Sequence, residues 1–310
     1  MIKHCLLAAL ATFTTMAASA QSMLNLANYR LTGNYALDTL DGLGLEASAV
    51  TYARDRGTLF VVGDEGLGVM EISLTGQTLG TMRFSDWPLA STNHDAEGLT
   101  YLGQGVLVVV EERLQDAYRF TYTAGGQVSL ASADFVSIGN TVGNVGTEGI
   151  SFDARDGRFF TVKQDNPQAV LGGTLSFAAS GGVSTLSPLF DADSVLGLAS
   201  LSDIQTLAPV TALAHTPAAD NLLILSLDSR MLVEVNRAGQ TLSRFDLAGI
   251  TRQAIEGVTI DERGVIYLVA EDSGTGNSRL FVLTPVPEPG PVALMLGGLA
   301  LLAWRQRRPV

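Results

Sequence analysis

The stretch Glu97-Gly-Leu-Thr-Tyr101 is followed by a glycine turn at residues 103–105 and by an apolar run, Val106–Glu111, and this plan recurs along the chain. The same pattern, an acidic residue, one or two small residues and a short apolar strand, restarts at Glu46, Glu148, Asp203 and Glu256. The restarts lie about 50 residues apart, a period typical of propeller blades. The sequence therefore predicts an all-β fold, a five-bladed β-propeller with four strands in each blade.

The two ends of the repeat region indicate how the ring closes. The fifth repeat has only three strands, and residues 29–37 form a strand left over before the first repeat. We expect this N-terminal strand to complete the last blade, because closure removes exposed strand edges. Residues 128–138 are expected to hold the fourth strand of the second blade. The long stretch 183–201 leaves open a sixth, degenerate blade.

Charge and cysteine content narrow the classes of partner. The 310 residues carry a formal net charge of −12. Setting aside Lys3, Arg305, Arg307 and Arg308 near the two ends leaves 15 basic residues against 31 acidic ones. Such an acidic body argues against nucleic acid and anionic lipid as partners and suits cations. The single cysteine, Cys5, lies in the N-terminal segment, so the body has no disulfide and no cysteine-based metal site.

The two ends of the chain are typical of export and sorting signals. Lys3, an apolar run and Ala18-Ser19-Ala20 predict a signal peptide, residues 1–20, cut by signal peptidase after Ala20. The predicted propeller domain covers residues 21–285. Residues 286–310 contain Pro287-Glu288-Pro289, an apolar run of about 14 residues, short for a membrane span, and a basic end. A plain C-terminal membrane anchor is the alternative to a sorting signal here.

This C-terminal tail closely resembles the PEP-CTERM signal, which an exosortase recognises in Gram-negative bacteria. The resemblance implies cleavage near Pro287, Glu288 and Pro289. The protein would be tethered at the inner membrane through this tail before sorting, and would then reach the cell surface or the extracellular matrix.

Acidic residues are expected to gather at one end of the central channel. In each blade the first strand runs antiparallel to the second, so the start of the first and the end of the second share one face of the propeller. The candidate metal ligands are Glu46, Glu97, Glu111, Glu148, Asp203, Asp228, Glu256 and Glu271. The candidate ligand contacts at the same mouth are His94, Asp95, Arg113 and Lys163.

Crowded carboxylates favour a hard cation, and Ca²⁺ accepts six to eight oxygen ligands in irregular geometry. The alternative is that each acid accepts hydrogen bonds from backbone N–H groups of the neighbouring blade and joins the blades together. His94 is a weak candidate base or ligand, and the aromatic side chains, Tyr101 included, are more typical of packing than of a sugar platform. We find no nucleophile elbow, no His-Glu-x-x-His and no phosphate-binding loop.

The repeats also resemble a known family. Asp95-Ala-Glu-Gly-Leu-Thr-Tyr101, Gly146-Thr-Glu-Gly-Ile150, Leu201-Ser-Asp-Ile204 and Glu256-Gly-Val-Thr-Ile-Asp261 are similar to segments of the SdiA-regulated family (YjiK/CarP-like propellers). The resemblance covers nearly the whole body. It implies an envelope-associated β-propeller, linked to calcium in some members, with a largely undefined activity.

These observations favour a secreted, surface-sorted propeller that binds Ca²⁺ and acts as an envelope or matrix binding module. Its ligand would be a small molecule, a polysaccharide or a protein. The competing hypothesis is a metal-dependent phosphoesterase or esterase, because a related group of propellers is labelled phytase-like esterase. A phytase would need more cations at its mouth than Lys163 and Arg113.

Overall fold

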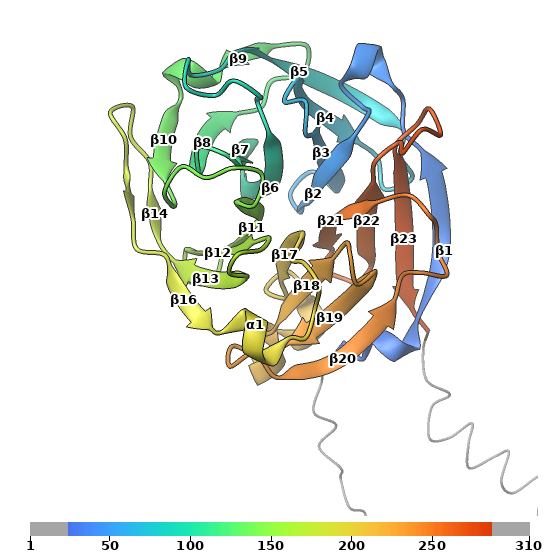
Figure 1. Ribbon diagram of the computed structural model, residues 1–310. Helices are drawn as coiled ribbons and strands as arrows, with labels where there is room; N and C mark the ends of the chain where they lie inside the picture. The colour runs from blue at the N-terminus through green and yellow to red at the C-terminus, as the bar shows by residue number, and fades with distance from the viewer. Residues whose placement is uncertain (1–23, 287–310) are drawn as a thin grey trace, which may run out of the picture.

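The computed structural model describes residues 24–286, which form five β-sheet blades around a central axis (Figure 1). From the axis to the rim, the first three blades are β2 (Ala47–Ala53), β3 (Thr58–Gly63), β4 (Gly68–Ile72) and β5 (Thr78–Asp86); β6 (Ala96–Gly103), β7 (Val106–Glu111), β8 (Asp116–Thr121) and β10 (Asp134–Ser137); and β11 (Thr147–Asp153), β12 (Arg158–Lys163), β13 (Ala169–Gly173) and β16 (Ser187–Phe190). The last two are β17 (Asp203–Thr206), β18 (Leu222–Ser226), β19 (Met231–Val235) and β20 (Thr241–Asp246); and β21 (Ile255–Ile260), β22 (Ile266–Ala270), β23 (Arg279–Pro285) and β1 (Tyr29–Ala36). The prediction of a five-bladed propeller is confirmed.

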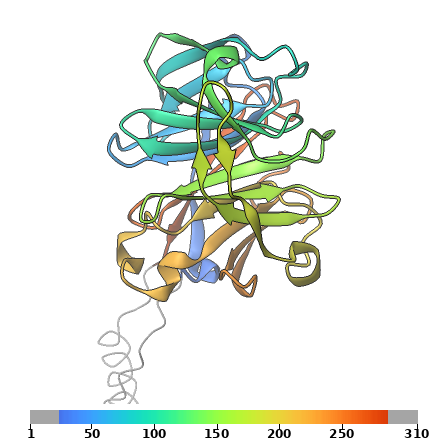
Figure 2. The ribbon, with the colours of Figure 1, turned by 90° about the vertical axis from the view of Figure 1, so that its left-hand side faces the viewer.

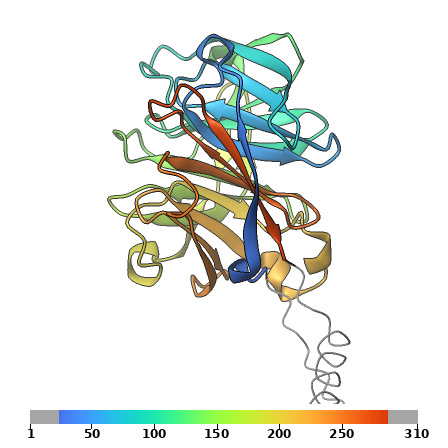
Figure 3. The same ribbon diagram turned by 90° about the vertical axis from the view of Figure 1, so that its right-hand side faces the viewer.

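The N-terminal strand closes the ring. β1 pairs antiparallel with β23, with Tyr29 opposite Pro285 and Ala36 opposite Arg279. Figure 3 shows the two strands, blue and red, side by side although they come from opposite ends of the chain. The buried Tyr29 hydroxyl donates to the carbonyl of Gly264 at 2.8 Å, and this bond ties the closing strand to the turn between β21 and β22. The expected closure by residues 29–37 is therefore confirmed.

Apolar side chains hold neighbouring blades together. Within residues 24–286 the buried apolar residues form five clusters, and each cluster lies between two adjacent blades. One of them packs Phe60 of the first blade against Leu99 and Tyr118 of the second. Because both faces of every blade are covered in this way, the middle strands are apolar up to their last residue, as in β7 and β18.

Residues 128–138 were expected to hold one strand, the fourth of the second blade. This prediction is wrong, because the segment is divided. β9 (Gln127–Ser129) pairs in parallel with β5 of the first blade, and the short 3₁₀ helix η3 (Leu130–Ser132) follows. Only then does β10 add the fourth strand of the second blade. Burial of Leu130 between the first two blades accounts for the break, since the side chain turns inward where a continuous strand would run along the rim.

The stretch 183–201 does not form a sixth blade. Its first residues, β15 (Val183–Ser184), pair with β14 (Leu175–Ser176) as a hairpin that stands at the rim in Figure 2. β16 then serves as the outer strand of the third blade, and the short helix α1 (Ala192–Val195) connects it to the fourth.

The predictions made for the ends of the chain, the cleavage after Ala20 and the processing at residues 287–289 included, lie outside the described residues. Within 24–286, no helix has the length and apolar character needed to cross a bilayer.

A closed ring of hydrogen bonds joins the five inner strands. The hydroxyls of Thr51, Thr100, Ser151 and Thr259 each accept the backbone N–H of the next inner strand, at 3.0–3.1 Å. At the remaining interface Thr259 donates to Gln205 at 2.9 Å. Small residues permit this approach: a Cβ on Gly257 would lie 2.9 Å from the carbonyl oxygen of Ser48 in the next blade. The joints between inner strands are thus mainly hydroxyl groups and not the repeated acids.

The Tyr29 hydroxyl gives a direct test of ring closure. Substituting Tyr29→Phe leaves the buried Gly264 carbonyl without its donor, and we expect the free energy of unfolding to fall by about 1–2 kcal/mol. Urea denaturation measures the change. The matched control is Tyr35→Phe on the same strand, which should change stability by less than about 0.5 kcal/mol. Equal effects of the two substitutions would contradict the role assigned to Tyr29.

Candidate metal centre at the acidic end of the channel

Bulges place three repeated acids at the start of the inner strands. In β6, Ala96 pairs with Glu111 and Gly98 with Val110, so Glu97 is the extra residue. Glu148 in β11 and Glu256 in β21 are extra residues in the same way. A bulge removes its residue from the regular ladder and re-aims the side chain. The glycine that follows each acid then makes room for the adjacent blade, which explains the repeated Glu-Gly pair.

The first and fourth blades depart from this arrangement. The hydroxyl ring shows that Ser48 in β2 occupies the position of Glu97, three residues before the ring hydroxyl. Glu46 therefore lies two residues earlier, in the left-handed region at φ 51°. In the fourth blade Asp203 stands at the glycine position, and its carboxylate accepts the N–H of Val258 at 2.7 Å and that of Ile204 at 2.8 Å. Asp203 thus joins two blades, the role expected under the alternative hypothesis.

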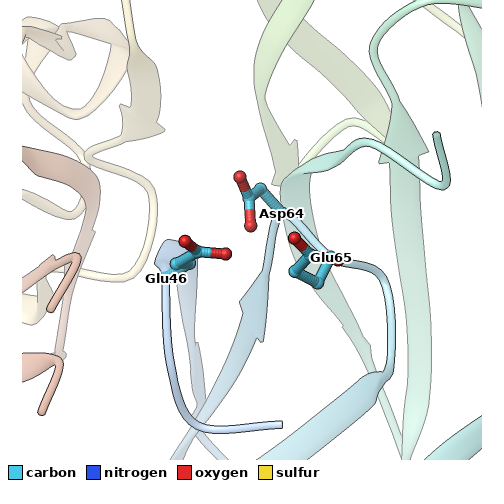
Figure 4. Close-up of side chains that lie close together, drawn as sticks. All are labelled: Glu46, Asp64 and Glu65. Atoms are coloured by element: carbon cyan, nitrogen blue, oxygen red, sulfur yellow. The ribbon is translucent and has the colours of Figure 1, made fainter. Parts of the chain in front are cut away.

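Asp64, directly after β3, lies at the centre of the acidic groups. Its carboxylate belongs to two sets of possible ligands, one with Glu46 and Glu65 and one with Asp95 and Glu97, and within each set the ligand atoms lie within 4.8 Å of one another. Figure 4 shows the carboxylates of Glu46, Asp64 and Glu65 directed toward the same space. Asp64 Oδ1 is buried and accepts no hydrogen bond from the described residues.

Further carboxyl groups surround these five. Glu112 and Glu148 form a carboxyl pair, as do Glu256 and Glu271. Glu112 also accepts the N–H of Gly146 at 2.7 Å, which anchors it at the edge of the third blade. We call the whole set the acidic mouth: Glu46, Asp64, Glu65, Asp95, Glu97, Glu112, Glu148, Glu256 and Glu271.

Four carboxyl groups of the acidic mouth, those of Asp64, Glu97, Glu148 and Glu256, show clearly raised pKa values. Burial, followed by the charge of Glu46, raises the pKa of Asp64 to about 7. Burial raises the pKa of Glu97 well above its usual range, and the charges of Asp95 and Asp64 add to the effect. Glu148 and Glu256 behave alike, with burial as the first cause and the charge of Glu97 as the second. Without a cation, this end of the channel therefore retains protons near neutral pH.

Few cationic side chains compensate this charge. Arg113 pairs with Asp95 and also contacts Asn144, and it forms the one ion pair to the acidic mouth among residues 24–286. Lys163 donates to the backbone carbonyls of Asp165 and Pro167 and not to a carboxylate of the mouth. His94 is exposed and stacks on Trp87, with the ring planes 8° apart. Both expected channel cations are thus present, but only Arg113 reaches the cluster.

The structure separates two other candidates from the cluster. Glu111 is fully buried, and its two carboxylate oxygens accept the Ser91 hydroxyl at 2.9 Å and the Leu114 N–H at 2.5 Å. Asp228 is exposed in the turn after β18. Of the eight candidate ligands, the structure brings Glu46, Glu97, Glu148, Glu256 and Glu271 into the acidic mouth and leaves Glu111, Asp203 and Asp228 outside it.

Asp64, Glu65 and Glu112 were not among the candidate ligands, although they belong to the acidic mouth. The signal was present in the sequence, because Asp64 and Glu112 each directly follow the second strand of their blade. The ends of the second strands were expected at this mouth, yet of the neighbouring pair Glu111 and Glu112 only Glu111 was a candidate ligand.

The raised pKa values predict how stability depends on pH. The folded protein holds protons at Asp64, Glu97, Glu148 and Glu256 that the unfolded chain, with ordinary carboxyl pKa values near 4, has already released. The native state therefore binds more protons, and the free energy of unfolding in EDTA should fall as the pH rises from about 5 to about 8. Urea denaturation at several pH values measures this slope. Asp64→Asn should flatten it, and a slope that is positive or unchanged in the variant would contradict the pKa shifts.

Comparison with known proteins agrees with the fold and the sorting tail. The family model described as SdiA-regulated matches residues 22–273, and the PEP-CTERM protein-sorting motif matches residues 285–308.

Solved structures with similar folds are distant. The β-propeller domain of Cps50 (Swd1) from Myceliophteria thermophila is 12% identical, with 73% of this chain and 63% of that chain covered and a TM-score of 0.38. A luciferin-regenerating enzyme is 10% identical, with 84% and 94% covered and a TM-score of 0.47. Virginiamycin B lyase from Staphylococcus aureus is 14% identical, with 77% and 66% covered and a TM-score of 0.39. The chain thus spans less than two thirds of the first of these proteins. The matched family model covers most of the chain, which therefore belongs to the SdiA-regulated family and carries a PEP-CTERM sorting motif.

Proposed function

We propose that this secreted propeller binds Ca²⁺ at the acidic mouth and acts as a binding module of the cell envelope or extracellular matrix. The observation that carries the proposal is Asp64: its buried Oδ1 accepts no hydrogen bond from residues 24–286, and its carboxylate belongs to two groups of possible ligands, one with Glu46 and Glu65 and one with Asp95 and Glu97. A buried carboxylate oxygen without a donor is costly, and a cation removes that cost.

The donor set suits calcium. Glu46, Asp64, Glu65, Asp95 and Glu97 supply oxygen ligands only, and oxygen is the ligand that hard cations prefer. Two oxygens bound to one Ca²⁺ at about 2.3–2.6 Å each lie at most about 5 Å apart, which the observed 4.8 Å limit satisfies. Zinc usually takes nitrogen or sulfur ligands. His94, the histidine nearest in sequence to Asp95 and Glu97, stacks on Trp87 and is not part of the donor set.

A binding role fits the site better than ester hydrolysis. A hydrolase of phosphate or carboxyl esters needs cations or a base directed at the substrate beside the metal. Here Lys163 donates to loop carbonyls, and Arg113 is engaged by Asp95 and Asn144. The sorting motif implies exosortase processing during export, and a module displayed outside the cell meets millimolar Ca²⁺. The signal-peptide cleavage after Ala20 and the final location at the surface or matrix are part of this proposal.

Thermal unfolding of residues 21–286 tests calcium binding. A site that binds only the folded state stabilises it by about 2.7 kcal/mol at a hundred-fold excess of ligand over the dissociation constant. We expect an increase in the unfolding temperature when EDTA is replaced by millimolar Ca²⁺, and we expect Asp64→Asn and Glu97→Gln to abolish it.

The matched control is Asp228→Asn, which removes an exposed carboxylate outside the acidic mouth and should keep the full calcium effect. In EDTA, Asp64→Asn should be more stable than the unchanged protein, because one crowded carboxylate is gone. An unfolding temperature that does not respond to Ca²⁺, or that responds equally in Asp64→Asn and Asp228→Asn, would refute the site.

A further inference from the structure

The opposite end of the channel has a different chemistry from the acidic mouth. One residue beyond the hydroxyl ring, three successive inner strands carry an aromatic side chain at the same position: Tyr52 in β2, Tyr101 in β6 and Phe152 in β11. All three pack against an apolar cluster, as expected for Tyr101, which stacks on Phe60, but they are only half-buried, so part of each ring remains exposed. Tyr101 lies four residues after Glu97, which places it about 13 Å further along the strand. The two ends of one channel therefore present carboxylates and aromatic rings respectively.

These aromatic side chains line a pocket of about 740 Å³. That volume lies within the range of small-molecule sites. The fourth blade supplies one wall through Pro209, at the start of the segment that connects β17 to β18. This segment is fixed in position, because the N–H of Thr211 donates to the carbonyl of Glu262 at 2.9 Å and Arg155 bonds Asp220 at 2.8 Å. The pocket is thus preformed by blades one to four.

Two arginines give the pocket its charge. Arg155 is held by Asp153 and Asp220. Arg54, in the turn after β2, is exposed and has no hydrogen bond or ion pair with the rest of residues 24–286. Asp55, the acid in this lining, already accepts the backbone N–H of Gln104 at 3.0 Å. The chain has a net charge of −12 and therefore repels anions in general. The unpaired guanidinium of Arg54 at the rim of the aromatic pocket attracts an anionic group at this place.

We propose that this second pocket binds an acidic sugar, a pyranose ring that carries a carboxylate. The apolar face of the sugar would lie against Tyr52, Tyr101 and Phe152, and its carboxylate would pair with the Arg54 guanidinium, which matches that group with two parallel hydrogen bonds. A carboxylate is favoured because the free donor is an arginine, and a sugar is favoured because the C–H groups on one face of a pyranose ring pack against aromatic side chains. The site involves none of the residues of the acidic mouth and does not depend on calcium.

Calorimetric titration with galacturonic acid and with its hexamer tests the assignment, using residues 21–286, which contain every described strand and the ring closure. EDTA is kept in all solutions, so that calcium held by the acidic mouth or by the sugar cannot produce the signal. Binding of the monomer assigns the site to free acidic sugars, and binding of the hexamer alone assigns it to a polysaccharide chain. We expect Arg54→Gln to weaken binding about tenfold or more.

Arg244→Gln, which removes an exposed arginine from the outer strand β20, is the matched control and should leave the affinity unchanged. Phe152→Leu should also weaken binding, with thermal unfolding used to verify that the variant is folded. Three outcomes would overturn the proposal: no binding of either uronate at millimolar concentration, equal binding of a neutral galactose hexamer or of inorganic phosphate, or an affinity that Arg54→Gln and Arg244→Gln change equally.

Discussion

The structure depends on the close approach of five inner strands around one axis. This approach requires small residues where blades meet, as at Gly149, where an added Cβ would lie 2.4 Å from the Asp203 carboxylate. It also requires a partner for each inner backbone N–H that no sheet provides, and the hydroxyls of Thr51, Thr100 and Ser151 supply that partner. The closing strand β1 holds the ring shut, since it pairs with β23 at the rim of the last blade.

The same geometry has an electrostatic consequence. A feature repeated in each blade is brought together at the axis, so acids that are far apart in sequence become neighbours in space. The charge of Glu97 raises the pKa of both Glu148 and Glu256 for this reason, after the larger effect of burial. Asp64 adds a buried oxygen without a donor to this group. Fold stability alone does not explain such crowding, because the blades are already joined by hydroxyl groups and apolar clusters. The cation that we propose for the acidic mouth would account for it.

Several features of the fold could be predicted from the sequence, because repetition is visible without a structure. The period near 50 residues indicated five blades, and the missing fourth strand of the last repeat indicated closure by residues 29–37. Local exceptions were not visible. The stretch 128–138 splits between two blades because Leu130 turns inward, and residues 183–201 complete the third blade instead of forming a sixth.

The candidate site was predicted in outline but not in detail. A one-residue bulge moves Glu97, Glu148 and Glu256 out of the pairing register. In the other two blades the spacing aligned Glu46 and Asp203 with Glu97, where the structure places Ser48 and Ser202. Side-chain direction also decides the outcome, as with Glu111, which follows the pattern yet bonds Ser91 and Leu114.

The central claim is that the acidic mouth exchanges its retained protons for a calcium ion. Calorimetric titration of residues 21–286 with Ca²⁺ near neutral pH, in two buffers with different heats of ionisation, measures binding and proton release together. The account predicts binding whose heat differs between the two buffers, because protons leave Asp64 and its neighbours as the cation enters. Binding without proton release, or no binding in either buffer, would contradict it.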